Sequence, residues 1–390
     1  MRLRNTVAPA LIIVCALFAP FQKAIAQVPC SPVILPKAAL FVNWPQYLHD
    51  PAHSGCNPYE TILNFDTVPK LALKWGFETQ VNSAPVVASG LLYLGSLNTL
   101  FALNAGTGTT VWTYMTGGQV DSTPAVASGV VYFGSEDNYF YALNANTGAL
   151  LWKFHTAPWP VEAAPTVANG AVYFASIDGM VYALNANSGA PLWQYSTGSG
   201  ADPAMSSPAV ANGNVYIGSH DYNVYALNAT TGTLVWKYTT GGEVLASPAV
   251  ANGMVYAGSY DYNVYALNAA TGTLMWKYTT GSVVFSSPAV AKGVVYVGGW
   301  ELYALNASTG ALNWDLDIEP LVTPSIANGL LFLGGGDDFS GFHSYVLSAF
   351  DSSVIWQQST DRVNFPPAVV NGVAYFPTVT ALNAFSPPSH

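Results

Sequence analysis

Basic residues are scarce in this chain: 11 lysines and arginines stand against 21 aspartates and glutamates in 390 residues, a formal net charge of −10 at pH 7. Residues 1–26 have the pattern of a cleaved signal peptide, in which Arg2 and Arg4 precede an apolar run and Ala24-Ile25-Ala26 offers a cleavage site. Cleavage would remove three basic residues and no acidic one, so the net charge would move from −10 to −13. A chain this acidic is excluded as a binder of nucleic acid or of an anionic membrane surface.

Long apolar runs and cysteines are also few. After residue 26 no run is long enough to span a bilayer, and neither Cys15 nor Cys30 follows the small residue that lipid attachment requires. We therefore expect a secreted or periplasmic monomer. Cys30 and Cys56 remain after cleavage, and an even pair in an oxidising compartment predicts a disulfide. Closing that loop would stabilise the fold by roughly 3 kcal/mol through its effect on the unfolded chain. Free thiols and metal ligation are the alternatives.

What the sequence does contain is one unit repeated eight times. Each unit has a strand start around a proline, a Val-Tyr strand, a stretch related to Ala-Leu-Asn-Ala, a Thr-Gly turn and a tryptophan. The tryptophans lie at positions 75, 112, 152, 193, 236, 276, 314 and 356, and the prolines at 85, 124, 165, 208, 248, 288, 324 and 367. A period of about 40 residues with several short strands per unit is typical of a β-propeller. Eight units therefore predict an all-β, eight-bladed β-propeller.

The fifth unit predicts four antiparallel strands per blade, over residues 248–251, 254–258, 264–268 and 273–278. Asn252-Gly253 suits the first hairpin turn, because both residues tolerate positive φ. The recurrent tryptophans are interpreted as packing between neighbouring blades, since a buried aromatic ring covers about 150–250 Å². The recurrent aspartates of the second turns are interpreted as turn-forming residues; they are Asp137, Asp178, Asp221 and Asp261.

Ring closure can also be predicted. The first tryptophan, Trp75, has no Ala-Leu-Asn stretch before it, and the last such stretch, residues 381–383, has no tryptophan after it. We expect the N-terminal strand to pair with the C-terminal strand and complete the last blade, which leaves no unpaired edge. The predicted organisation is a signal peptide over residues 1–26, an arm over residues 27–69 held by the Cys30–Cys56 disulfide, and a propeller over residues 70–390.

The repeated Ala226-Leu227-Asn228-Ala229, Thr231-Gly232 and Trp236 resemble the repeats of pyrroloquinoline quinone (PQQ) dehydrogenases and of their non-enzymatic, BamB-like relatives. The opening Asn43-Trp44-Pro45-Gln46-Tyr47 is similar to segments that precede such propellers. The similarity covers about residues 43–385. It is specific for the fold, because the repeated residues are those that build blades.

The resemblance implies two functions. A dehydrogenase of this family would hold PQQ, which carries three carboxylates, together with a calcium ion and cationic groups, and it would act on an alcohol or a sugar. This sequence lacks the adjacent cysteines of those enzymes and a Cys-x-x-Cys-His haem motif, and its mature part has one arginine and seven lysines. We therefore favour a non-catalytic binding or interaction scaffold over a PQQ- and calcium-dependent dehydrogenase with Asp121 or Glu162 as base. An enzyme of another class, acting for instance on carbohydrate, is a third reading.

The channel mouth is the predicted site. In this topology the second turns and the connections between blades share a face, and the residue three before each proline should line the mouth. These residues form a polar half and an apolar half: Asn364, Asn82, Asp121 and Glu162, then Met205, Leu245, Phe285 and Leu321. We expect a protein partner, a small ligand or a cation there, with oxygen ligands suited to calcium and Arg362 nearby to pair with a carboxylate or an anion. The alternative is that these positions simply vary around a water-filled channel.

A second candidate site is the stretched turn of residues 334–343, where Asp337 and Asp338 are metal-ligand candidates. Extra length on one loop of a regular scaffold is where function often lies, although glycine-rich turns with two aspartates are also common solvated turns. His49 and His53 have the spacing of a metal pair on a helix, but Pro51 between them argues against a helix there.

Overall fold

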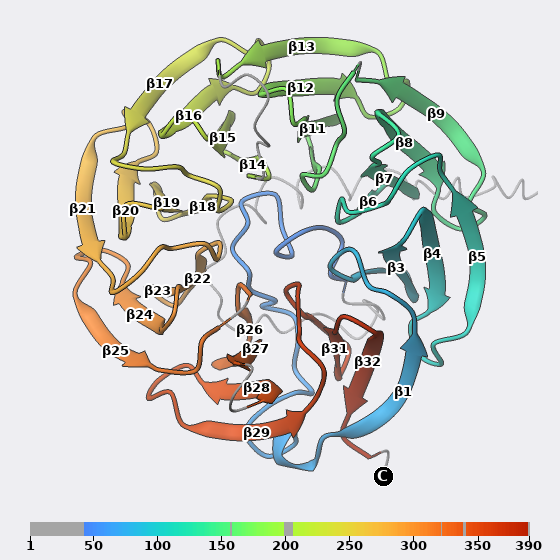
Figure 1. The fold of residues 1–390 in the computed structure, drawn as a ribbon, viewed down its shortest axis with the longest axis vertical. Coiled ribbons are helices and arrows are strands. Elements are labelled where there is room, and N and C mark those ends of the chain that lie inside the picture. Colours follow the sequence, from blue (N-terminus) through green and yellow to red (C-terminus); the bar gives the residue numbers. More distant parts are fainter. Residues whose placement is uncertain (1–42, 157, 199–205, 321, 338–340, 389–390) are drawn as a thin grey trace, which may run out of the picture.

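The computed structural model describes residues 43–156, 158–198, 206–320, 322–337 and 341–388. Within them the chain forms eight four-stranded antiparallel sheets, which stand as blades around one central axis (Figure 1). The predicted all-β, eight-bladed propeller is confirmed. In the fifth unit the strands are Ala249–Ala251, Met254–Gly258, Asn263–Asn268 and Leu274–Thr279, each end within one residue of the predicted range.

The strands of the first four blades run in sequence order from the axis to the rim. They are β2 (Val86–Ala88), β3 (Leu91–Ser96), β4 (Thr99–Asn104) and β5 (Thr110–Met115); β6 (Ala125–Ala127), β7 (Val130–Gly134), β8 (Tyr139–Asn144) and β9 (Leu150–His155); β10 (Thr166–Ala168), β11 (Ala171–Ala175), β12 (Met180–Asn185) and β13 (Pro191–Ser196); β14 (Ala209–Ala211), β15 (Asn214–Gly218), β16 (Asn223–Asn228) and β17 (Leu234–Thr239).

Blades 5 to 7 repeat this order, and blade 8 departs from it. The strands are β18 (Ala249–Ala251), β19 (Met254–Gly258), β20 (Asn263–Asn268) and β21 (Leu274–Thr279); β22 (Ala289–Ala291), β23 (Val294–Gly298), β24 (Leu302–Asn306) and β25 (Leu312–Leu316); β26 (Ser325–Ala327), β27 (Leu330–Asp337), β28 (Gly341–Ser348) and β29 (Val354–Ser359); β30 (Ala368–Val370), β31 (Val373–Pro377), β32 (Ala381–Ser386) and β1 (Ala72–Glu78). A short 3₁₀ helix, η1 (Val68–Lys70), precedes β1. No helix in the described residues is long and apolar enough to cross a membrane.

Strand β1 closes the ring. It pairs antiparallel with β32, with Trp75 opposite Ala384 and Glu78 opposite Ala381, so the outer strand of blade 8 comes from the opposite end of the chain. The predicted closure is thus confirmed. Because closure gives the C-terminal strand a partner from the start of the propeller, that edge is not left exposed.

The repeated tryptophans lie between blades, as predicted, and they also donate hydrogen bonds. The Trp276 indole of blade 5 donates from Nε1 to the Ala307 carbonyl of blade 6 at 2.9 Å. The Tyr256 hydroxyl donates to the same carbonyl at 3.1 Å. Gly310 lies over the indole ring in the left-handed region at φ +73°, and a Cβ there would stand only 2.6 Å from the ring. Turn glycine, tryptophan and tyrosine therefore form one interlocking contact between blades.

The same paired donation recurs at other interfaces between blades. Tyr93 with Trp112, Tyr132 with Trp152, Tyr173 with Trp193, Tyr216 with Trp236, Tyr296 with Trp314 and Tyr375 with Trp75 bond in turn to the carbonyls of Ala145, Ala186, Ala229, Ala269, Ala349 and Ala105.

The interface between blades 7 and 8 is different. Phe332 replaces the tyrosine there, and Trp356 packs against Phe376 and Phe385 with ring centroids 6.1 and 5.0 Å away. The third turn that supplies the alanine carbonyl in other blades does not exist in blade 8, because its outer strand is β1. Ring closure thus replaces a hydrogen-bonded interface with an aromatic one.

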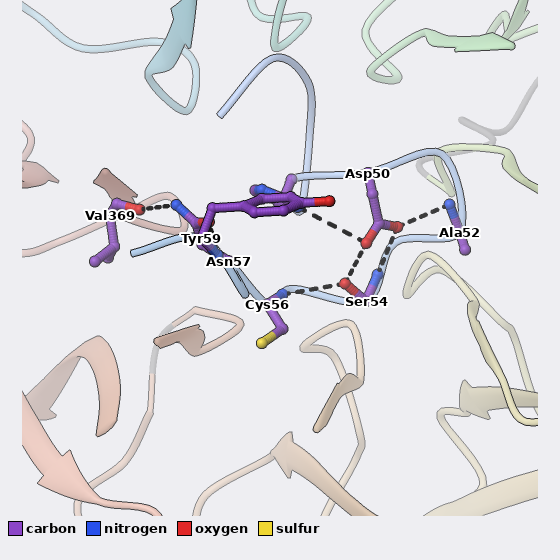
Figure 2. Close-up of polar contacts among 8 residues, drawn as sticks. Asp50, Ala52, Ser54, Cys56, Asn57, Tyr59 and Val369 are labelled. Atoms are coloured by element: carbon purple, nitrogen blue, oxygen red, sulfur yellow. Dashed lines mark hydrogen bonds and ion pairs between the residues drawn. The ribbon is translucent and has the colours of Figure 1, made fainter. Parts of the chain in front are cut away.

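Residues 43–57, here called the channel segment, cross the centre of the ring (Figure 1). The innermost strands turn one edge toward the axis, and the channel segment accepts hydrogen bonds from seven of those edges. The donors are the amides of Val87, Val126, Val167, Val210, Val250, Val290 and Ile326, and the acceptors are carbonyl oxygens at 44, 45, 51, 52, 54 and 55 and the Gln46 side chain. In the eighth blade the Asn57 side chain donates instead to the Val369 carbonyl at 2.9 Å (Figure 2). The segment therefore satisfies one inner-edge group in every blade.

Asp50 shapes the turn of the channel segment. Its carboxylate accepts hydrogen bonds from the Ala52 amide at 2.9 Å and from the Ser54 amide at 3.2 Å, and it also bonds the Ser54 hydroxyl (Figure 2). Burial would raise the pKa of Asp50, but His49, whose Nδ1 lies 3.8 Å from Oδ2, and the hydrogen bonds from Ser54 lower it. His49 and His53 have φ of 77° and 57°, so the segment is not helical and the histidines are not a helical metal pair.

The Tyr47 ring points from the channel segment toward a ring of hydroxyls. Its hydroxyl lies 3.2 Å from the Ser287 hydroxyl. Residues just before the blade prolines are linked from blade to blade, since the amides of Ser207, Ser247 and Ser287 donate to hydroxyls of the next blade at 2.8 to 2.9 Å. The central channel is therefore occupied by the chain's own residues rather than open along its length.

Candidate functional site: the channel mouth

Connections between blades lie beside the second turns of the following blade, on one face of the ring. The Glu136 amide donates to the Gln119 carbonyl at 2.9 Å, and the Gly117 amide donates to the Asp137 carboxylate at 2.8 Å. The same arrangement recurs in blade 5, where the Tyr260 amide donates to the Glu243 carbonyl. This face carries the predicted mouth residues.

Two of the predicted polar residues are in direct contact. The Asn82 side chain donates to an Asp121 carboxylate oxygen at 2.8 Å. Its own carbonyl oxygen is occupied by the Leu97 amide at 2.9 Å. Asn82 therefore orients Asp121, while its own oxygen accepts a hydrogen bond from the neighbouring turn.

Asp121, Glu136 and Glu162 form the acidic cluster of the mouth. Burial raises the pKa of Asp121, and Glu136 raises it further, while the hydrogen bond from Asn82 lowers it. Burial also raises the pKa of Glu162, with added contributions from the charges of Asp121 and Glu136. These directions mean that the three carboxylates repel one another in a partly dehydrated place. Glu136 is the member that the proline count did not select.

Arg362 and Asn364 lie apart from this cluster. The Arg362 guanidinium is 5.9 Å from the centre of the Phe342 ring, and within the described residues no ion pair joins it to Asp121 or Glu162. Asn364 is exposed, and its amide donates to the Pro377 carbonyl at 3.2 Å. The acidic cluster thus has no cationic partner among the described side chains at the mouth.

Beyond the acidic cluster, over the blades that follow it around the ring, the mouth face is aromatic. Leu245 and Phe285 are half-buried there, while Met205 and Leu321 lie outside the described residues. The second turns of blades 4 to 6 display four exposed rings, here called the aromatic patch: Tyr222, Tyr260, Tyr262 and Trp300, exposed by 47%, 38%, 51% and 68%. His220 and Glu243 lie beside them, with Nε2 and Oε1 3.2 Å apart. Counting back from the prolines could not find this patch, because its residues belong to the second turns.

The recurrent aspartates of the second turns have the structural role that was predicted. Asp261 accepts hydrogen bonds from the Gly241 amide at 2.8 Å, the Asn263 amide at 3.2 Å and the Tyr265 hydroxyl. Burial would raise its pKa, but these hydrogen bonds lower it.

For the second candidate site, Asp337 ends β27 and pairs in register with Gly341 of β28, so the expected stretched turn is an extended hairpin. Asp338 lies outside the described residues, and the metal role of both aspartates stays a prediction. No group of three or more acidic, histidine or cysteine residues that could hold a metal occurs in the described part of the chain. Cys56 is buried at 2% exposure, whereas Cys30 lies outside the described residues, so their pairing also stays a prediction.

Two cavities lie away from the mouth. One of about 270 Å³ lies between the outer strands of blades 7 and 8 and is lined by Leu73, Gln358, Ser359, Thr360, Asn383 and Phe385. Another of about 150 Å³ lies beside the start of the channel segment, next to Asn43 and Pro45. Neither is lined by a carboxylate, a basic side chain or a cysteine.

Solved structures with this fold have different functions. BamB from Moraxella catarrhalis matches with a TM-score of 0.69 and 20% identity over 82% of this chain and 98% of that one. The quinohemoprotein alcohol dehydrogenase of Comamonas testosteroni matches with a TM-score of 0.74 and 15% identity over 88% and 80%. The computationally designed protein Ika8 matches with a TM-score of 0.68 and 14% identity over 80% and 98%. At these identities the likeness shows the fold alone.

Sequence comparison is more specific. No curated protein matches the chain closely enough to count as a relative. The family model described as outer membrane protein assembly factor BamB, in contrast, matches residues 98–209, 178–320 and 281–385, which together cover most of the chain. The chain therefore belongs to the BamB-like family of PQQ-type repeat β-propellers.

Proposed function

We propose that this chain is an exported, non-catalytic scaffold that binds its partner at the channel mouth. The observation that carries the proposal is the acidic cluster: Asp121, Glu136 and Glu162 stand together without a cationic partner among the described side chains, and burial and mutual repulsion raise the pKa of Asp121 and Glu162. Like charges held together in a partly dehydrated place are costly to a fold. Such a group is better explained by recognition of a positively charged partner than by blade packing.

The rival function is a PQQ- and calcium-dependent dehydrogenase. Calcium prefers oxygen ligands, but the described residues contain no group of three or more acidic, histidine or cysteine side chains that could hold a metal. A cofactor with three carboxylates would also be repelled by the acidic cluster. The Arg362 guanidinium is 5.9 Å from the centre of the Phe342 ring, and no described ion pair joins it to that cluster. The residues of the mouth thus fit the anionic cofactor poorly, and we assign no catalytic residue.

Thermal unfolding of the mature protein separates the two functions. The protein is melted with calcium alone, with PQQ alone and with both. Ligand at 100 times its dissociation constant would stabilise the fold by about 2.7 kcal/mol, a resolvable shift in Tm. We expect no saturable shift that requires both additions. If such a shift occurs, and if Asp121→Asn with Glu162→Gln abolishes it, the scaffold proposal is wrong and oxidation of alcohols and sugars should be assayed.

Export rests on residues 1–26, which have a basic start, an apolar run and a small-residue cleavage site. Mass spectrometry of protein purified from the periplasm or medium should give a mature chain that begins at Gln27. Non-reducing peptide mapping of the same sample should recover Cys30 and Cys56 in one cross-linked peptide. Retention of residues 1–26 in the purified protein would refute export by cleavage.

A further inference from the structure

Two tyrosines of the aromatic patch occupy backbone positions that disfavour them. Tyr222 and Tyr262 have φ of 70° and 69°, in the left-handed region that favours glycine and asparagine. The equivalent second-turn positions of blades 2 and 3 are Asn138 and Gly179, with φ of 67° and 77°. The chain therefore uses the expected residue types in two blades and bulky rings in two others.

The fold gains little from these rings. Tyr222 and Tyr262 accept hydrogen bonds only through their backbone carbonyls, from Thr240 and Thr280 at 2.8 to 3.0 Å. Asn138 makes the same backbone contacts with Thr156. The side chains are about half exposed, so they could be replaced without loss of these bonds. A half-exposed ring at a strained backbone position, whose side chain makes no hydrogen bond among the described residues, indicates a binding function.

The rest of the mouth face indicates what is bound. The acidic cluster belongs to blades 2 and 3 and the connections that lead into them, and the aromatic patch belongs to blades 4 to 6, which follow them around the ring (Figure 1). A ligand that touches both must reach along the mouth from blade 2 to blades 4 to 6, which an extended chain does more readily than a small molecule. Arginine and lysine side chains are attracted both to aromatic faces and to carboxylates.

We infer that the mouth binds an extended, basic peptide segment of a partner protein. Its lysine or arginine side chains pair with Asp121, Glu136 and Glu162, and its remaining cationic and apolar side chains pack on Tyr222, Tyr260, Tyr262 and Trp300. A neutral glycan would use the aromatic patch but gain nothing from the acidic cluster, and an acidic peptide would be repelled. This inference rests on the proposed scaffold function and specifies its partner.

Panning a random 12-residue peptide phage library on the mature protein tests the inference, with a fluorescent copy of the most enriched peptide for titration. We expect enrichment of peptides rich in arginine and lysine, with affinity that falls as NaCl is raised. Tyr222→Asn with Tyr262→Gly should weaken binding at least tenfold, and Asp121→Asn with Glu162→Gln should do the same. The tyrosine variant should keep or raise Tm, because it installs the residues that the other blades already use.

The matched control is Leu192→Ser with Val235→Ser on the outer strands β13 and β17, where both side chains are about half exposed at the rim. It should leave peptide affinity unchanged. The inference is overturned if no peptide is enriched, if enriched peptides are neutral or acidic, or if the tyrosine variant binds as well as the native chain. If calcium together with PQQ also stabilises the protein, the scaffold function itself is wrong. If neither basic peptides nor calcium with PQQ bind, only the identity of the partner is wrong.

Discussion

Removal of one buried hydroxyl tests how the blades are joined. Tyr256 is fully buried, and its hydroxyl and the Trp276 indole both donate to the Ala307 carbonyl, at 3.1 and 2.9 Å. A carbonyl oxygen has two lone pairs and can accept both bonds. Tyr256→Phe keeps the ring and removes one donor, and the carbonyl keeps the other. We expect a loss of about 1 kcal/mol in the free energy of unfolding.

The same change should cost more when the second donor is absent. In a Trp276→Phe background the Tyr256 hydroxyl is the remaining partner of a carbonyl whose residue is 1% exposed. Its removal leaves that carbonyl buried and unpaired, which costs about 1–3 kcal/mol. Guanidinium unfolding followed by far-UV circular dichroism measures the four proteins of the cycle at constant m value. A coupling energy of about 1 kcal/mol is expected.

Equal costs of Tyr256→Phe in the two backgrounds would refute this reasoning. The aromatic interface supplies an internal control, because Phe332 already lacks the hydroxyl and blade 8 lacks the third turn that would accept it. Phe332→Tyr places a hydroxyl at a fully buried position. It should destabilise by about 1–3 kcal/mol rather than stabilise.

Three further changes test other contacts. Asn57→Ala removes the side-chain bonds to the Val369 carbonyl and from the Tyr59 amide and should cost about 2 kcal/mol; an unchanged denaturation midpoint would show that the channel segment adds no stability there. Burial lowers the pKa of His53 to about 4 from 6.5. The stability of the fold with neutral His53 is therefore fully present above pH 6.5 and is lost as pH falls toward 4. The free energy of unfolding should fall by about 3 kcal/mol over this pH range, and this fall should be absent in His53→Gln. Parallel plots of unfolding free energy against pH for the two proteins would contradict the prediction. Gly258→Ala puts a Cβ 2.4 Å from Val284 Cγ1 and should cost about 1–3 kcal/mol by overpacking, as read from chemical denaturation; a neutral result would mean that the blades can shift apart.

The candidate site was only partly predictable from sequence. Counting back from the prolines selected Asn82, Asp121 and Glu162, because the repeat places equivalent residues at equivalent points of the ring. It missed Glu136, which is brought beside Asp121 by the second turn of the next blade. It also suggested a partner for Arg362 that the described structure does not provide, since the guanidinium lies over Phe342.

The amino-acid sequence by itself determined the number of blades, their strands and the closure of the ring, because these depend on short-range patterns that the chain repeats eight times. Tertiary structure alone decided how the channel segment meets every blade, which carbonyl receives the tyrosine and tryptophan donors, and which mouth residues touch. Those contacts join residues that are tens to hundreds of positions apart, as between Asn57 and Val369. They are set by the curvature of a closed ring, which no local pattern in the sequence specifies.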